Sequence, residues 1–418
     1  MMSETMKIVA GLDIGNGYVK GKAQLFGSDA WVAVDLPSVV SYTAGVGMLP
    51  KEATDGYIEA MDNEMEASVS SSTMPGTDEG RVFFGQRAIR SGESLREFNI
   101  SDLTSKCQDS LSTILVLGAL AGAALRLYWN ENHQLPAKLD VDACIGIALP
   151  IEEFMTYRDV YPGKLMSGDH TVLIRNFEHS IPVTVHFTSV TPVPEGAAAQ
   201  YAITELGAKF LQFALDEARA RGEEINPGYT GDVLAGVEDT IGVDIGEGNV
   251  NFPVYTGGSV NIEASRSINK GYGTVLTSVV NGVRGVKGLS FESRKDLADF
   301  MLDTSMTPSK RMRRERLQHY IDEQVKIFCR EVMSEFTNIF HKVGARTDAI
   351  YVYGGGANGV KDALYPQLVE AVSDDEGNSI PVIYLNSSYS RDLNRNGLFQ
   401  VATYSASEAW GATEPAAE

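Results

Sequence analysis

The sequence predicts an α/β protein made of two similar halves. The stretch GLDIGNGYVK at residues 11–20 returns as GVDIGEGNVN at residues 242–251, with six of the ten positions identical. After each copy, β-rich runs alternate with runs of helical periodicity. With 418 residues the chain is long enough for two domains, each with its own core. We therefore expect a duplicated domain with one ligand held between the halves.

Each copy has the pattern of a strand, a tight glycine turn and a second strand. KIVAGLDIG leads through Gly-Asn-Gly into YVKGKAQLF, and DTIGVDIGEG leads into NVNFPVYTGG. Glycines let backbone N–H groups approach a phosphate closely. The aspartates at the strand ends, Asp13 and Asp244, suit a hydrated Mg²⁺ ion, which is commonly held by carboxylates, phosphates and water. A turn-forming aspartate would explain one copy but not two.

A third glycine motif follows in the second half. The strand expected at residues 348–353 runs into Gly354, Gly355, Gly356 and Ala357, and a helix is expected from Gly359. A tight strand-to-helix turn is one reading of this pattern. The other is a backbone surface lying against a ligand at a helix N-terminus. Because it follows two phosphate-type hairpins, we interpret it as the nucleoside-facing wall.

The remaining pattern completes the α/β reading. Residues 48–80 look loop-like and are expected to form a small peripheral lobe, and residues 223–239 are expected to be a loop leading into the second hairpin. We expect helices at residues 101–130, 195–222, 273–283 and 311–340, and β-rich segments at residues 142–150, 170–177 and 181–193.

Composition excludes several classes of protein. The net charge of −20 disfavours direct binding to nucleic acid, so any DNA would need a basic adaptor. The three cysteines lie far apart and match no zinc or disulfide pattern, which indicates a reducing cytoplasm. The start of the chain lacks a signal-peptide pattern. The apolar stretch at residues 113–129 contains Arg126, and we expect a buried helix there rather than a membrane span.

The three glycine motifs resemble the phosphate-one, phosphate-two and adenosine motifs of the actin superfamily. Further segments, ALPIEEFMTYRD, TPVPEGAAAQY, GYGTVLTSVV and LNRNGLFQVA, are similar to stretches of the ParM/StbA-type plasmid segregation actins. The resemblance covers most of the chain. Two departures stand out: Glu247, where this family more often has a small residue, and the longer segments at residues 48–80 and 223–239.

The resemblance implies the actin-like fold, in which two ribonuclease H-like domains hold a nucleotide in the cleft between them. It places domain I at residues 1–194, with a small lobe at about 40–100. Domain II would span residues 195–387, and residues 388–418 would return to domain I. The implied activity is hydrolysis of ATP or GTP with Mg²⁺, coupled to assembly of a homopolymer filament. A ParR-like adaptor on a centromere-like DNA site would connect the filament to a plasmid, without direct DNA or membrane binding. The alternative is a small-molecule kinase of the same superfamily.

The resemblance also implies roles for individual residues. Glu195 would orient or deprotonate the attacking water, although a carboxylate that complements a helix dipole is the alternative explanation. Asp13 and Asp244 would act in catalysis by holding Mg²⁺ through water. The nucleotide would be bound by Gly15, Asn16, Gly17, Tyr18, Lys20, Gly246, Glu247, Gly248, Asn249, Gly354, Gly355, Gly356 and Ala357.

Overall fold

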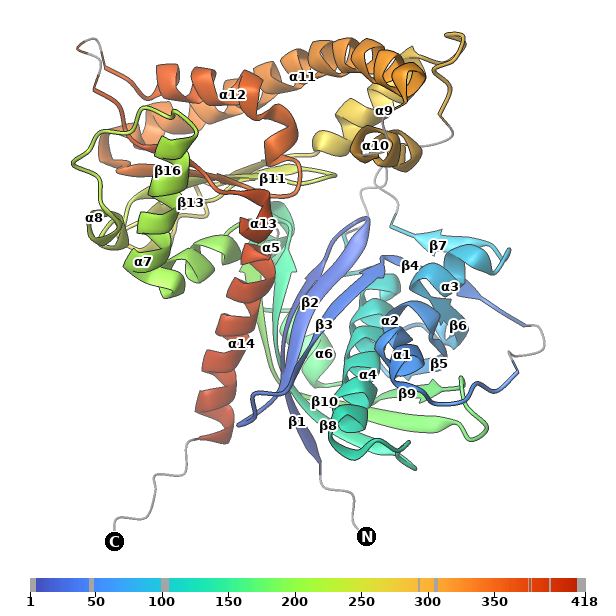
Figure 1. Cartoon of the computed structure of the whole chain (residues 1–418). Helices are drawn as coiled ribbons and strands as arrows, with labels where there is room; N and C mark the ends of the chain where they lie inside the picture. The colour runs from blue at the N-terminus through green and yellow to red at the C-terminus, as the bar shows by residue number, and fades with distance from the viewer. Residues whose placement is uncertain are drawn as a thin grey trace, which may run out of the picture. The chain divides into compact units, whose positions relative to one another are not determined.

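The chain forms two compact units in the computed structural model (Figure 1). Unit 1 comprises Met1–Ala202 and Asn394–Glu418, and unit 2 comprises Ile203–Leu393. The sequence predicts boundaries at residues 194 and 388. Because unit 1 continues to Ala202, Glu195 lies in unit 1 and not in the second domain. The structure describes residues 5–44, 49–98, 105–291, 294–303, 307–374, 376, 378–390 and 392–411.

Unit 1 is organised around one mixed sheet of ten strands. Its strand order is β3-β2-β1-β8-β10-β9-β5-β6-β4-β7. The strands are β1 (Met6–Ile14), β2 (Tyr18–Leu25), β3 (Trp31–Pro37), β4 (Val39–Tyr42), β5 (Glu66–Ser71), β6 (Gly80–Phe84), β7 (Leu95–Glu97), β8 (Leu139–Leu149), β9 (His170–Ile174) and β10 (Ile181–Pro194). Helices α1 (Asp55–Glu59), α2 (Met61–Glu64), α3 (Gly85–Arg90), α4 (Ser110–Asn132), α5 (Ile151–Tyr157), α6 (Tyr161–Met166) and the 3₁₀ turn η1 (Gly76–Asp78) complete this part of the chain.

Strand β1 is covered on both faces. Because successive side chains in a strand point to opposite faces, residues 8, 10, 12 and 14 share one face. They join the large core cluster that also contains helix α4. Val9 packs on the other face with Cys144, Ala402 and Ala406, the last two on helix α14 (Leu393–Trp410). This double burial explains why KIVAGLDI is apolar without alternation.

Helix α4 has the length and composition of a membrane-crossing helix, with a mean hydropathy of 1.7, but its apolar window is wholly buried inside unit 1. The predicted buried helix is therefore confirmed. It begins at Ser110 rather than near residue 101, since Asp109 caps it by accepting a hydrogen bond from the N–H of Leu111. Residues 101–104 lie outside the described part of the chain.

The loop-like reading of residues 48–80 is wrong. Described residues of this segment form α1, α2 and β5, and β5 pairs with β6 and β9 to extend the sheet of unit 1. Met61, Met65 and Ala67 are fully buried. These elements are not predictable from the sequence pattern, because each is only four to six residues long and is too short for a clear periodicity.

Unit 2 contains a second sheet of seven short strands, in which β11 pairs with β12, β13 and β16. Its strands are β11 (Thr240–Ile245), β12 (Val250–Phe252), β13 (Val254–Thr256), β14 (Ser259–Val260), β15 (Arg266–Ile268), β16 (Ala349–Tyr353) and β17 (Val382–Tyr384). Helices α9 (Tyr272–Gly282), α11 (Pro308–Val343) and α12 (Ala357–Ala371) pack on one face of the sheet (Figure 1). The other elements are α7 (Ala198–Ala220), α8 (Gly231–Ala235), α10 (Arg294–Leu302), α13 (Ser387–Ser390) and the 3₁₀ turn η2 (Gly344–Arg346).

Two expected elements differ in detail. The helix expected at residues 195–222 begins only at Ala198 and is interrupted at Gly207, whose φ of 64° and ψ of −163° are not helical. The segment at residues 223–239 is not entirely loop, because it contains the short helix α8. Thr230 caps that helix by accepting a hydrogen bond from the N–H of Val233.

Helix α14 packs closely against the sheet of unit 1 and against the start of α7 through three glycines. Gly11 and Gly146 are register partners in β1 and β8. A Cβ atom built on Gly11 would lie 2.2 Å from the N atom of Phe399, and one on Gly146 would lie 2.2 Å from the carbonyl oxygen of Leu398. A Cβ on Gly397 would lie 1.7 Å from the carbonyl oxygen of Ala198. All three obstructing atoms belong to the backbone, so no side-chain rotation can relieve the contacts.

We expect Gly146→Ala to destabilise the chain by about 1–3 kcal/mol, the usual cost of overpacking a core. The matched control is Gly163→Ala in helix α6, where a Cβ would meet nothing within 4 Å. That change should be neutral or stabilise by up to about 1 kcal/mol, since alanine favours helices. Urea unfolding of the three proteins measures both effects. Equal stability of Gly146→Ala and the parent would contradict the close packing of α14.

Candidate functional site

The first glycine turn is held in place from within unit 1. The N–H of Gly15 donates to the carbonyl oxygen of Tyr18 at 3.0 Å, which closes the turn between β1 and β2. Ser38, which is fully buried, donates its hydroxyl to the carbonyl oxygen of Gly15 at 2.6 Å and its N–H to that of Gly17 at 3.0 Å. No pattern in the sequence marks Ser38, because its role depends on the β3–β4 corner lying beside the turn.

Asp13 lies at the end of β1, next to this turn and on the same face of the strand as Gly11. Withdrawal from water and the nearby carboxylate of Glu195 raise the pKa of Asp13 to about 6, while Lys106 and Lys20 partly oppose the shift. Lys20 is directly opposite Asp13 in the antiparallel β1–β2 pair and is exposed. The fold therefore brings Glu195, which is distant in the sequence, close to Asp13 and Lys20 of the first hairpin.

Glu195 is buried in the turn that joins β10 to α7. Its N–H donates to the carbonyl oxygen of Leu149 at 2.7 Å, which continues the β8–β10 pairing by one residue. Gly196 follows with φ of 81°, a conformation that favours glycine. Glu195 precedes the helix by three residues and does not open it, so complementing a helix dipole is a poor explanation for it.

Lys106 belongs to the same group of charges and is not among the predicted site residues. Its Nζ lies 3.2 Å from Oε1 of Glu195 and 3.2 Å from the carbonyl oxygen of Ile14, the residue just before the glycine turn. No motif surrounds Lys106 in the sequence. Only the folded chain places it beside Asp13 and Glu195.

The second glycine turn repeats the first in unit 2. The N–H of Gly246 donates to the carbonyl oxygen of Asn249 at 2.9 Å, as Gly15 does to Tyr18. The carbonyl oxygens of Gly246 and Glu247 accept hydrogen bonds from Tyr272 and Gly273, both at 2.9 Å. The turn is thus fastened to the first residues of helix α9, and Gly248 lies within it.

The third glycine motif lies against the second turn. Asp244 is buried and is the register partner of Tyr353, the last residue of β16. Gly354 follows with φ of 98°, and a Cβ there would lie only 2.5 Å from Oδ1 of Asp244. The N–H of Gly356 donates to the carbonyl oxygen of Ile245 at 2.8 Å. The predicted residues of the second half, including Gly355 and Ala357, therefore form one local group in unit 2.

Glu247, the unusual residue of the second turn, has a specific partner. Its Oε1 lies 2.9 Å from Nε of Arg294 on α10, and both side chains are about half exposed. Such an ion pair contributes little to stability. The effect of this ion pair is local: Arg294 partly neutralises the negative charge of Glu247 at the glycine turn.

The described residues contain no cluster of three or more histidine, cysteine, aspartate or glutamate side chains suited to bind a metal ion by themselves. The two carboxylates of Asp13 and Glu195 nevertheless repel each other. A cation near them would relieve that repulsion. This donor set fits Mg²⁺ held by one or two carboxylates together with phosphates and water.

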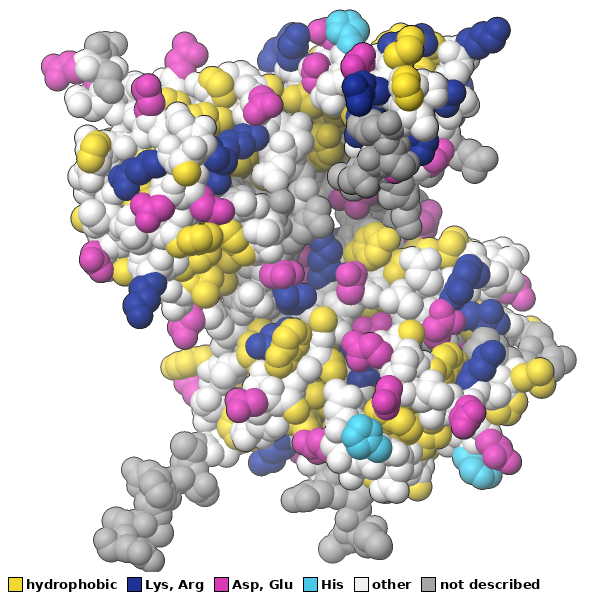
Figure 2. Space-filling view, viewed as in Figure 1, with side chains coloured by type: hydrophobic (Ala, Val, Ile, Leu, Met, Phe, Trp, Pro, Cys, Tyr) yellow, Lys and Arg dark blue, Asp and Glu magenta, His cyan; other side chains and the backbone are white. Residues whose placement is uncertain are grey.

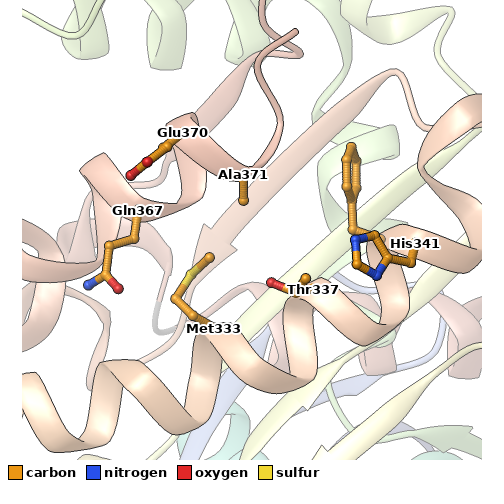
Figure 3. A pocket seen from close by; sticks show the side chains of 7 residues that line it. Met333, Thr337, His341, Gln367, Glu370 and Ala371 are labelled. Carbon is orange, nitrogen blue, oxygen red and sulfur yellow. The ribbon is translucent and has the colours of Figure 1, made fainter. Parts of the chain in front are cut away.

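A surface pocket of about 460 Å³ lies elsewhere in unit 2, between α11 and α12 (Figure 3). The figure shows Thr337 and His341 on one helix and Gln367 and Glu370 on the other. None of its lining residues is among the predicted site residues. It is lined by Met333, Thr337, Phe340, His341, Gln367, Glu370 and Ala371.

Comparison with known proteins shows the fold. A family model of the N-terminal domain of actin-like proteins matches residues 11–197. No curated protein sequence matches the chain. The structure as a whole is similar to solved actin-like proteins, so the chain has the actin-like fold and its N-terminal half carries the sequence pattern of actin-like proteins.

The structural relatives include ParM proteins. Bacillus thuringiensis ParM with ATP is 15% identical, with a TM-score of 0.59, and the match covers 96% of this chain and 99% of that one. The same ParM has also been solved with AMPPNP and with ADP. A non-polymerisable quadruple mutant of pCBH ParM is 14% identical, with a TM-score of 0.58 and coverage of 95% and 99%. Ta0583, an archaeal actin homolog, is 14% identical, with a TM-score of 0.60 and coverage of 95% and 99%.

The raised pKa of Asp13 predicts that the folding stability of the chain, measured without nucleotide, depends on pH. A carboxyl group with a raised native pKa binds its proton more tightly in the folded than in the unfolded state, so folding loses stability as pH rises from about 4 through about 6. Asp13→Asn removes this loss. We expect the variant's stability relative to the parent to grow between about pH 4 and pH 7.5, by on the order of 1–3 kcal/mol.

Urea unfolding at several pH values measures this difference. Asp29→Asn, which removes an exposed carboxylate after β2, is the charge-matched control. If the Asp13→Asn difference stayed flat or shrank with rising pH, the site would not disfavour the ionised carboxylate as described.

Proposed function

We propose that the chain binds ATP with Mg²⁺, assembles into filaments and hydrolyses the nucleotide. The observation that carries this proposal is the group formed by Asp13, Lys106 and Glu195 beside a glycine turn, in a chain with the actin-like fold. A turn of N–H groups, two carboxylates and a lysine are the parts that phosphoryl transfer needs, since its catalysis is mostly positioning and electrostatic stabilisation. The relatives solved with ATP, AMPPNP and ADP support a nucleotide as the ligand.

Each unit supplies one phosphate-binding hairpin in this proposal. In unit 1, the N–H groups of residues 16–18 in the glycine turn bind phosphate oxygens, and Lys20 adds a positive charge across from Asp13. In unit 2, the turn at residues 246–249 binds phosphate in the same way, and the turn at residues 354–357 faces the nucleoside. GTP in place of ATP is compatible with the same phosphate contacts.

Asp13 and Asp244 would hold Mg²⁺ through water molecules. When bound, Mg²⁺ would supply charge neutralisation for the phosphates. Asp13 is well suited, because burial and Glu195 already disfavour its ionised form and a cation would reverse that effect. Asp244 is suited by its position at the matching point of the second hairpin, where the glycine of residue 354 leaves room beside its carboxylate.

Glu195 would act on the attacking water. The water oxygen forms a bond to the terminal phosphorus as the bond from that phosphorus to the bridging oxygen of ADP breaks. The water proton passes to the Glu195 carboxylate, and the products are ADP and inorganic phosphate. Burial of Glu195 just after β10 fixes its position, and Lys106 at 3.2 Å holds its orientation.

Filament assembly follows from a head-to-tail contact, which generates open helical polymers when its rotation does not close. The pCBH ParM relative supports self-assembly as the output, since it was made non-polymerisable by mutation. We propose plasmid segregation as the purpose, with a separate ParR-like protein as adaptor to a centromere-like DNA site and the cytoplasm as the location.

Glu195→Gln should separate assembly from hydrolysis. The amide retains an acceptor for Lys106 but cannot take the water proton, so hydrolysis should slow by about 10²–10⁴-fold while ATP-dependent assembly persists. Phosphate release and light scattering, followed together after adding ATP and Mg²⁺, test this. Glu152→Gln, an exposed change on α5, is the charge-matched control. No scattering from the parent would contradict filament formation, and parental phosphate release from Glu195→Gln would move the general base elsewhere.

The purified chain should not bind duplex DNA tightly at physiological salt. Its net charge is −20, and the face shown in Figure 2 carries acidic and basic side chains interspersed rather than a continuous basic surface. Gel-shift titration with random duplex DNA, at two salt concentrations, is the measurement. Submicromolar binding that weakens steeply with salt would remove the need for an adaptor and contradict this part of the proposal.

A further inference from the structure

The backbone around Lys106 is anchored by hydrogen bonds that are separate from the ion pair between Lys106 and Glu195. Glu153 on α5 accepts hydrogen bonds from the N–H of Lys106 at 3.0 Å, the N–H of Cys107 at 3.1 Å and the hydroxyl of Ser105 at 2.5 Å. Lys164 on α6 donates to the carbonyl oxygen of Cys107 at 3.3 Å. Two helices therefore fix the backbone from which the Lys106 side chain extends.

The ammonium group of Lys106 lies beside the glycine turn that follows β1. Its acceptors are the Glu195 carboxylate and the carbonyl oxygen of Ile14, which belongs to the same peptide group as the N–H of Gly15. The Lys106 side chain is 14% exposed and that of Glu195 is 11% exposed. An ammonium group has three N–H donors, and the described residues provide acceptors for two of them.

Charges of both signs meet around Lys106. The ammonium groups of Lys106 and Lys20 both act on the Asp13 carboxylate, and Lys106 also pairs with Glu195 at 3.2 Å. A partly buried ion pair of this kind is weak evidence of a stabilising role, because desolvation offsets much of the attraction. It does bear on the proposed function, since Lys106 donates to one oxygen of the carboxylate that is proposed to accept the proton from water.

We propose that Lys106 exchanges partners, between the Glu195 carboxylate that it contacts in the structure and the terminal phosphate of a bound nucleoside triphosphate. This inference rests on the proposed function. A phosphate carries more negative charge than a carboxylate, and lysine reaches it as a flexible point charge. The exchange frees Glu195 for the attacking water only when a third phosphate is present. Loss of that phosphate returns Lys106 to Glu195.

The proposal predicts that Lys106 discriminates triphosphate from diphosphate. Lys106→Met should weaken binding of AMPPNP with Mg²⁺ by roughly 10–100-fold, the range expected for one hydrogen bond to a charged group. Binding of ADP with Mg²⁺ should change by less than about 3-fold, because the partner phosphate is missing. Lys106→Arg keeps the positive charge and should restore most of the preference for AMPPNP.

Calorimetric titration of both nucleotides against each variant gives the ratio of affinities. Lys164→Met is the matched control, since Lys164 anchors the same backbone segment without contacting Glu195. Its ratio should equal that of the parent. Should Lys106→Met fail to fold, Lys106→Gln provides the same comparison, because it removes the charge but keeps a donor.

Equal losses of AMPPNP and ADP affinity in Lys106→Met or Lys106→Gln would overturn the proposal and make Lys106 a structural residue. The same ratio in the parent and in either variant would also overturn it. A parent that binds neither nucleotide would overturn the proposed function, and this inference with it. A selective loss for AMPPNP, rescued by arginine, would support the exchange.

Discussion

The contact between helix α14 and strands β1 and β8 is the constraint on which the site in unit 1 depends. Gly11 and Gly146 lie side by side in the sheet, and the backbone at Leu398 and Phe399 rests where their side chains would be. This contact closes the second face of β1, whose first face is already packed against the core that contains α4. A strand fixed on both faces can hold Asp13 at its end in a defined position, with the glycine turn directly behind it.

Charge at the end of that strand is arranged by the surrounding elements rather than by β1 itself. Glu195 directly follows β10, Lys20 lies on β2, and Lys106 lies in the segment before α4. The carboxylate of Glu195 disfavours ionisation of Asp13, while the two lysines oppose that effect. Such a balance is sensitive to any added phosphate or cation. This sensitivity is the physical basis for linking nucleotide state to the position of Lys106.

The two hairpins show how one local pattern can acquire different surroundings. Gly15 and Gly246 make the same backbone hydrogen bond across their turns. Asp13, however, lies near a second carboxylate and two lysines. Asp244 instead lies against Gly354 and beside Tyr353. Burial and the nearby Asp244 carboxylate raise the pKa of Tyr353 well above its ordinary value. The first environment suits proton and charge chemistry. The second is built from close backbone approach, which suits binding a ligand.

The sequence by itself determined the α/β class, the two hairpins and the third glycine motif, because these depend on local rules: glycine at tight turns, aspartate at strand ends and hydrophobic periodicity in long elements. It also singled out Glu195, through its resemblance to related proteins. Tertiary structure alone decided that residues 48–80 extend the sheet, that Glu195 sits in a turn before its helix, and that Lys106, Ser38 and Glu153 support the site. These features arise from contacts between segments distant in the chain, and such contacts leave no spacing pattern in the sequence.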